Sequence, residues 1–209
     1  MTAGKLQKLT TELKNDASMG KLPLARSRGD IVPGEGSEAA NIFFIGEAPG
    51  YQESLEHRPF VGRSGKLLRQ VLDQIHLSPD DYYISNIVKV RPPDNRDPSP
   101  EEIEAFRPYI NREITILEPL LIVTLGRFSM AKFLPDVRIS QVHGRLHRVV
   151  WQNKKQYVLP MYHPAAALRS TRTKEQFIAD MQKIPKAVAW IEDQREAKVL
   201  TEQVVEALL

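Results

Sequence analysis

Carboxylates, an asparagine and a histidine stand in four short segments that are otherwise rich in glycine, proline and arginine. The four segments are residues 46–53, 58–65, 86–96 and 162–169. A glutamate or a histidine can transfer a proton or stabilise a charge that develops during a reaction. An asparagine carboxamide offers a hydrogen-bond acceptor and donors together. We therefore seek the chemistry of this chain in these four segments.

Apolar runs that are typical of buried strands precede these segments. Strands are expected over residues 41–46, 81–88, 120–126 and 156–162, with a further short strand over 149–151. Helices are expected over residues 64–75, from 99 onward and over 127–133. Ligands of parallel sheets bind beyond the carboxyl ends of the strands. The loops after Ile45, Val88, Leu125 and Tyr162 are therefore expected to form the site.

The alternation of strands and helices predicts an α/β fold. We expect a three-layer α/β/α arrangement with a central, mostly parallel four-stranded sheet. The 209 residues suffice for one such domain, so a single domain is expected over residues 1–209. A helix over residues 3–16 and a helix over residues 195–208 are expected to flank it.

Composition limits the cofactors and partners. The chain has no cysteine, which excludes disulfides, thiolate zinc sites and cysteine-held iron–sulfur clusters. Residues 141–174 carry seven Lys and Arg side chains and no acid, which suits a polyanionic partner or a solvated basic surface equally well. No run is long and apolar enough to span a bilayer, and no signal peptide stands at the N-terminus, so a cytoplasmic protein is expected.

The segments resemble the motifs of family 4 of the uracil-DNA glycosylase superfamily, in the same order along the chain. The motifs are Gly46-Glu47-Ala48-Pro49-Gly50, the segment 58–65, Asn86 with the segment that follows it, and His163-Pro164. The resemblance covers roughly residues 8–190. It implies an enzyme that turns a nucleotide out of uracil-containing DNA and hydrolyses its N-glycosidic bond. We expect it to act as a monomer, without a membrane and without a cofactor.

The resemblance also implies the residues of a uracil pocket. Phe60 matches the aromatic ring that stacks on the base, and Asn86 matches the asparagine that pairs with uracil N3–H and O4. His163 matches the histidine that stabilises charge on the departing uracil, helped by backbone amides of Glu47 and Ala48.

Two glutamates are candidates for the catalytic carboxylate. Glu53 matches the family residue that assists the attack of water or stabilises the cationic sugar, and it is favoured. Glu47, beside the uracil-binding turn, is the second candidate. Relatives commonly carry acidic residues where this chain has Tyr51, Gln52 and Ser54.

DNA is expected to meet cations and one apolar wedge around this pocket. Leu168 resembles a wedge that enters the duplex, and Arg169 follows it directly. The candidates for phosphate contact are Arg63, Ser64, Lys89, Arg91, Arg96 and Arg169.

Members of family 4 usually hold a four-iron cluster through four cysteines, which this chain lacks. By position, the counterparts are Met19, Leu22, Val90 and Phe106. All four are apolar, so we expect a small hydrophobic cluster to pin the N-terminal segment against the loop after Asn86. The basic, histidine-containing insertion of the branch that cross-links to DNA is missing between Pro92 and Pro100, so cross-linking is not expected.

Three other functions stay open. The chain could be a non-catalytic module that recognises damaged bases. It could be a metal-dependent hydrolase that uses Glu53, Glu56 and His57 as ligands. It could also be a glycosylase that prefers another deaminated base, such as hypoxanthine or xanthine.

Overall fold

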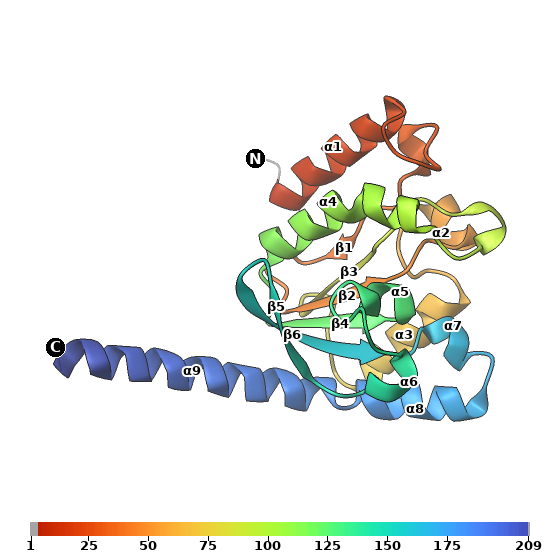
Figure 1. The fold of residues 1–209 in the computed structure, drawn as a ribbon. Helices are drawn as coiled ribbons and strands as arrows, with labels where there is room; N and C mark the ends of the chain where they lie inside the picture. Colours follow the sequence, from red (N-terminus) through yellow and green to blue (C-terminus); the bar gives the residue numbers. More distant parts are fainter. Residues whose placement is uncertain (1–3, 209) are drawn as a thin grey trace.

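A computed structural model describes residues 4–208, and the side chains of residues 4–197. One sheet lies at its centre, with the strand order β1-β3-β2-β4-β6-β5 (Figure 1). The strands are β1 Glu35–Gly36, β2 Ile42–Gly46, β3 Tyr82–Asn86, β4 Leu121–Leu125, β5 His147–Trp151 and β6 Lys154–Met161. The four strands β3, β2, β4 and β6 are parallel, whereas β1 and β5 pair antiparallel at the two edges. The expected four-stranded sheet is therefore the parallel centre of a six-stranded one.

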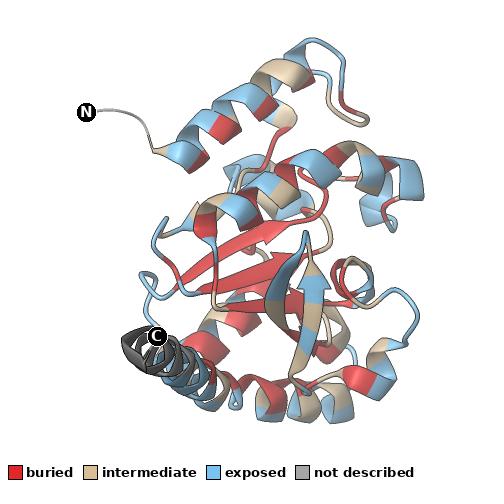
Figure 2. Ribbon diagram, turned by 60° about the vertical axis from the view of Figure 1, so that its left-hand side comes forward, coloured by how far each residue is buried: buried red, intermediate tan, exposed pale blue. Residues whose placement is uncertain are grey.

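Helices cover both faces of the sheet and complete the predicted three layers (Figures 1 and 2). The helices are α1 Lys5–Ser18, α2 Tyr51–Glu56, α3 Arg63–Gln74, α4 Pro100–Leu117, α5 Arg127–Ala131, α6 Ile139–Val142, α7 Pro164–Ala167, α8 Thr171–Met181 and α9 Ile184–Leu208, with 3-10 turns at Arg28–Asp30 and Pro93–Asn95. Successive residues of β2 point to opposite faces: Phe43 packs with α1 and α4, whereas Phe44 packs with α3, α8 and the start of α9. Strands buried on both faces explain the continuous apolar runs.

Local sequence determines where α4 begins and which side of α3 is buried. Ser99 accepts a hydrogen bond from the backbone N–H of Glu102, and the Glu102 carboxylate accepts one from the N–H of Ser99. This capping box, with Pro100 in the first helical position, starts α4 at the predicted place. The apolar positions Leu67, Leu68, Val71 and Leu72 recur at helical spacing and form the buried side of α3.

The two flanking helices differ from their predicted bounds. The N-terminal helix runs over Lys5–Ser18 and ends two residues after the predicted end at residue 16, whereas the predicted first residue, number 3, lies outside the described residues. Arg112 of α4 binds its Glu12 at 2.6 Å. Residues 195–208 are the second half of the longer helix α9, which begins at Ile184. No helix in the described part of the chain has the length and apolarity needed to cross a membrane.

Candidate active site

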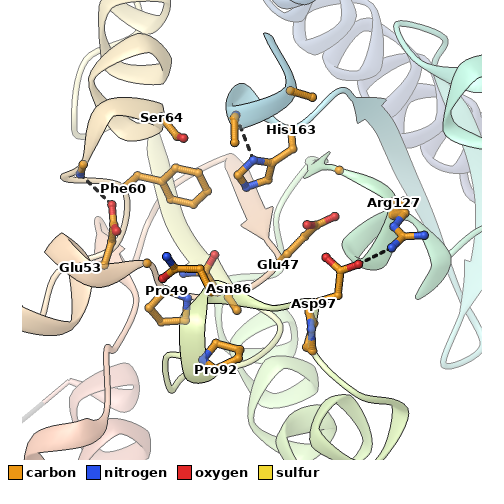
Figure 3. A pocket seen from close by; sticks show the side chains of 18 of the residues that line it. Glu47, Pro49, Glu53, Phe60, Ser64, Asn86, Pro92, Asp97, Arg127 and His163 are labelled. Carbon is orange, nitrogen blue, oxygen red and sulfur yellow. Dashed lines mark hydrogen bonds and ion pairs between the residues drawn. The ribbon is translucent and has the colours of Figure 1, made fainter. Parts of the chain in front are cut away.

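An open cavity of about 550 Å³ lies beyond the carboxyl ends of the parallel strands (Figure 3). The loops after β2, β3, β4 and β6 all contribute to its wall, as the sequence predicts for a parallel sheet. All five residues assigned to uracil binding line it, namely Glu47, Ala48, Phe60, Asn86 and His163, and Glu53 lines it too. The structure thus brings together the residues that the family resemblance selected.

The side chains of Asn86 and Phe60 line the cavity, and both lie close to the backbone of Gly46. Asn86 ends β3 and is paired in register with Gly46 of β2. A Cβ atom on Gly46 would lie 2.3 Å from Asn86 Oδ1 and 2.5 Å from Phe60 Cζ, so a side chain at position 46 would displace both groups. Within the described residues no hydrogen bond engages the Asn86 carboxamide, and Figure 3 shows it beside the cavity near Phe60. Its donors and acceptor are therefore left for a ligand.

The loop that carries Phe60 is anchored by an arginine that sequence reasoning missed. Phe60 is buried and has a φ of 54°, in the left-handed region. Arg69 of α3 donates from Nε to the Phe60 carbonyl at 3.3 Å and from Nη2 to the Pro59 carbonyl at 3.3 Å. The Arg69 guanidinium also pairs with Glu35 of β1, which binds Arg58 as well. This network holds the ring of Phe60 at the cavity wall.

Glu53 supports the same loop from the other side. Its Oε1 accepts hydrogen bonds from the backbone N–H groups of Val61 at 3.0 Å and Gly62 at 2.7 Å. These two residues directly precede α3, so the carboxylate satisfies free amides and adds negative charge at a helix N-terminus. Both bonds use Oε1, and none in the described structure uses Oε2.

Glu47 lies deeper, where the ends of β2 and β4 meet. Its Oε1 accepts a hydrogen bond from the backbone N–H of Phe128 at 3.1 Å. Gly126, with a φ of 104°, lets the chain pass so close that a Cβ there would lie 2.3 Å from Glu47 Oε1. Loss of hydration raises the pKa of Glu47 to about 7, an effect to which the nearby charge of Asp97 adds. Protonated and ionised forms of the Glu47 carboxyl group therefore coexist near neutral pH.

His163 is neutral, and its tautomer follows from one hydrogen bond. Burial lowers the pKa of His163 to about 4. Nδ1 accepts a hydrogen bond from the backbone N–H of Ala165 at 3.1 Å, so in the neutral ring the proton sits on Nε2. The ring centroid lies 6.0 Å from that of Phe60, at an interplanar angle of 32°. His163 thus offers an N–H donor next to the stacking aromatic, as Figure 3 shows.

Polar and charged side chains line the mouth of the cavity. Arg63, Ser64 and Arg169 line it without an ion pair in the described structure, and Leu168 beside Arg169 is partly exposed. Arg96 also lines it, but its guanidinium is held by both oxygens of Glu102 at 2.5 and 2.9 Å.

A second ion pair at the mouth had no counterpart in the sequence analysis. Arg127 Nη2 lies 2.5 Å from Asp97 Oδ2, and both side chains are mostly exposed and line the cavity. The pair joins the loop before α4 to the start of α5, on the side of Glu47 (Figure 3). A contact between residues 30 positions apart leaves no trace in local sequence patterns.

The prediction that Lys89 contacts a phosphate is wrong. Its side chain is 0% exposed and pairs with Glu113 of α4 at 2.6 Å, with a further hydrogen bond to Ser85. The loop after Asn86 turns inward here and places Val88, Lys89 and Val90 in the interior. Burial lowers the pKa of Lys89, which the Glu113 carboxylate opposes.

The positions at which the family resemblance implies an iron–sulfur cluster cannot hold one in this chain. Leu22, Val90 and Phe106 are buried in one hydrophobic cluster with residues of α1 and α4, as predicted. Met19 does not join them, because its side chain is 59% exposed, and this part of the prediction is wrong. Thioether and hydrocarbon side chains offer no thiolate, so the residues do not fit an iron–sulfur cluster. Apolar packing joins the segment around residue 22 to α4 instead.

The alternative of a metal-dependent hydrolase receives no support from the geometry. In the described residues no group of three or more Asp, Glu or His side chains lies close enough to hold a metal ion. The proposed ligands therefore do not converge: Glu53 turns toward the amides of Val61 and Gly62, and His57 stands at the end of α2 in a left-handed conformation.

Comparisons with known proteins agree with this site. A family model described as the uracil DNA glycosylase superfamily matches residues 33–184. A type-4 uracil-DNA glycosylase of Archaeoglobus fulgidus is 40% identical over 185 residues, which cover 86% of this chain and 92% of that protein. A type-4 uracil-DNA glycosylase of Sulfurisphaera tokodaii is 42% identical, with coverages of 86% and 83%. One of Thermotoga maritima is 38% identical over 169 residues, with coverages of 81% and 87%. The chain therefore belongs to the type-4 family of the uracil-DNA glycosylase superfamily, as a member without cysteines.

Proposed function

We propose that this chain is a DNA repair enzyme that hydrolyses the N-glycosidic bond of uracil in DNA. Its relatives are named type-4 uracil-DNA glycosylases, at 38–42% identity over most of the chain. The observation that carries the proposal is that an unengaged carboxamide and a neutral histidine donor both lie near one aromatic ring in the wall of the cavity. Action in the cytoplasm as a monomer stays a prediction from the sequence.

Base recognition falls to Asn86 and Phe60. Turning a nucleotide out of the stack costs a few kcal/mol, and stacking on an aromatic ring returns about 1–3 kcal/mol. The Asn86 carboxamide can accept from uracil N3–H and donate to O4. Cytosine presents the opposite pattern at these positions, so in the orientation that pairs with uracil the carboxamide oxygen would face cytosine N3 and the NH2 group would face its amino group.

Departure of the base is assisted by His163. Negative charge develops on the uracil oxygens while the bond from N1 to C1′ breaks. A neutral imidazole donating from Nε2 can stabilise that charge where it forms, and its position is fixed in advance by the bond from Ala165 N–H to Nδ1. The backbone amides near Glu47 and Ala48 lie in the same wall of the cavity.

Glu53 is the better of the two candidate carboxylates. An oxocarbenium-like sugar calls for negative charge or an activated water beside it. Glu53 uses Oε1 for the loop amides, and its Oε2 stays available for a water or for the sugar. Glu47 has a pKa of about 7 and is partly protonated near neutral pH, so it supplies less negative charge. We assign the catalytic role to Glu53 and a pocket-shaping role to Glu47.

The products of the reaction test this function. Incubation with an oligonucleotide that contains one uracil should release free uracil and leave an abasic site, detected by chromatography and by alkaline cleavage. Matched oligonucleotides with cytosine or thymine at that position should stay intact. Glu53→Gln should lower the single-turnover rate at least tenfold without changing which base is released. Selective binding of uracil-DNA without any release by the wild type would show a non-catalytic module instead.

A further inference from the structure

A second hollow lies next to the uracil pocket, and the reaction described above does not use it. It has a volume of about 530 Å³ and is open to solvent. Its wall is formed by Leu24, Ala25, Arg26, Asp30, Arg91 and Pro93. Pro92 and Asn95 line the uracil pocket, so the short loop around them separates the two hollows. A DNA strand that leaves the uracil pocket across this loop would enter the second hollow.

An exposed aromatic ring, which lines neither hollow, contacts an arginine of the second one. Tyr51 directly follows Gly50 of the pocket wall and is 54% exposed, although it is a large side chain on a short helix. The Arg91 guanidinium lies over its ring, 5.1 Å from the centroid, and Arg91 Nε donates to Asn95 Oδ1 at 2.8 Å. Arg91 thus holds one side of the ring in place and leaves the ring open to a further partner.

Two guanidinium groups and one carboxylate line the second hollow, so its wall keeps a net positive charge. Arg26 and Arg91 both line it, and neither guanidinium has an ion pair among the residues that the structure describes. Asp30 is the one acid in the wall, and its Oδ2 accepts hydrogen bonds from the backbone N–H groups of Arg26 and Ser27, both at 2.7 Å. That carboxylate is occupied in capping a turn, so the guanidinium donors remain available to an anion.

We propose that the hollow with Tyr51 binds single-stranded DNA on one flank of the uracil. One base stacks on Tyr51, and one phosphate lies between Arg26 and Arg91. An aromatic platform beside cations is the arrangement that binds single strands without reading sequence. Within a duplex both faces of each base are covered by its neighbours, whereas a base of a single strand can turn one face to Tyr51, so we expect the flank to be single-stranded. This inference rests on the proposed function, because the flank is placed by the uracil in the neighbouring pocket.

Binding measurements with a non-cleavable substrate test this proposal. The probes are fluorescent oligonucleotides with 2′-fluoro-2′-deoxyuridine, single-stranded or duplex, that carry one or six nucleotides on either side. Wild type should bind the single strand with one particular long flank more tightly than the strand trimmed on that side. Tyr51→Ala should weaken this binding about tenfold. Arg26→Ala should reduce the slope of log K against log salt by about 0.7, one phosphate contact.

Matched controls separate this subsite from a general effect on the surface or on α2. Arg28→Ala removes an exposed arginine outside both hollows, and Leu55→Ala trims an exposed side chain one turn after Tyr51. Both should bind the long single strand within twofold of wild type. With the flank trimmed, the difference between wild type and Tyr51→Ala should disappear.

Two outcomes would overturn the proposal. One is equal affinity of wild type for long and trimmed single strands, and the other is a Tyr51→Ala variant that loses affinity equally on single-stranded and duplex probes of every length. Uracil release from a cleavable oligonucleotide, measured in parallel, keeps the function itself apart. Release without dependence on the flank refutes the second site alone, whereas no release from any substrate refutes the function.

Discussion

The buried ion pair of Lys89 and Glu113 makes a strong prediction about stability. The two side chains are 0% and 6% exposed and lie 2.6 Å apart, and Ser85 binds both. Removing one partner of such a pair leaves the other charge buried, which costs about 3–5 kcal/mol. Lys89→Met should therefore lower the free energy of unfolding by about that amount.

Removal of the whole network should cost much less. In the variant Ser85→Ala with Lys89→Met and Glu113→Leu, no charge or hydroxyl of the network is left without a partner, and the volume is nearly kept. This variant should be at least roughly 2 kcal/mol more stable than Lys89→Met alone. Urea denaturation followed by circular dichroism measures both free energies, and equal m-values would confirm that the same transition is compared. A loss below about 1 kcal/mol in Lys89→Met, or a larger loss in the triple variant than in the single one, would refute the reasoning.

Three further predictions concern the cavity. Glu47 has a folded pKa of about 7, above the usual 4.5, so its contribution to stability is complete below pH 4.5 and is lost as the pH rises through 7. Between pH 4.5 and 8, the free energy of unfolding of wild type, measured by urea denaturation, should fall by roughly 3 kcal/mol more than that of Glu47→Gln. An equal change in the two proteins would contradict this. Asp97→Asn should release Arg127 from its ion pair, so that Arg127 can bind a DNA phosphate. The slope of log K against log salt for DNA binding, measured by fluorescence anisotropy, should then become steeper by about 0.9. An unchanged slope would show that Arg127 does not contact DNA. Phe60→Ala should lower kcat/KM for uracil release roughly 10- to 100-fold through lost stacking, whereas a loss below threefold would mean that the ring does not contact the base.

The parts of the site that sequence could predict are those encoded locally. The apolar run before Gly46 and the one that leads to Asn86 mark adjacent parallel strands, and their carboxyl ends must meet at one edge of the sheet. The capping box of Ser99 and Glu102 similarly places the start of α4. Family resemblance then selected the residues within the strand-end loops that line the cavity.

The errors concern contacts between segments far apart in the chain. Lysine is usually a surface residue, and the burial of Lys89 depends on Glu113, which lies 24 positions later on α4. The strand β1 has two residues, too few for a periodic pattern, and is defined by its pairing with β3. Met19 is apolar like Leu22, but α1 ends at Ser18 and the chain turns it toward solvent.

The packing around Phe106 shows how the N-terminal segment is attached to α4 without cysteines. The side chain of Phe106 is completely buried, and with Leu22 and Val90 it fills the space between the N-terminal segment and α4. The hydrogen bond from Tyr109 to Asp16 at 2.6 Å and the ion pair of Arg112 with Glu12 add polar links between α1 and α4. Apolar burial and these links connect α1 and the segment around residue 22 with α4.

Release of free uracil under multiple turnover, with EDTA present, decides whether this protein is a uracil-DNA glycosylase that works without a metal ion. The comparison includes wild type, Asn86→Ala and His163→Ala, each shown to be folded by circular dichroism. Wild type should sustain release, and each variant should release uracil at least 100-fold more slowly, because Asn86→Ala loses recognition of the base and His163→Ala loses stabilisation of the leaving anion. Release by His163→Ala at the rate of wild type, or a wild type that binds uracil-DNA and never releases the base, would contradict these predictions.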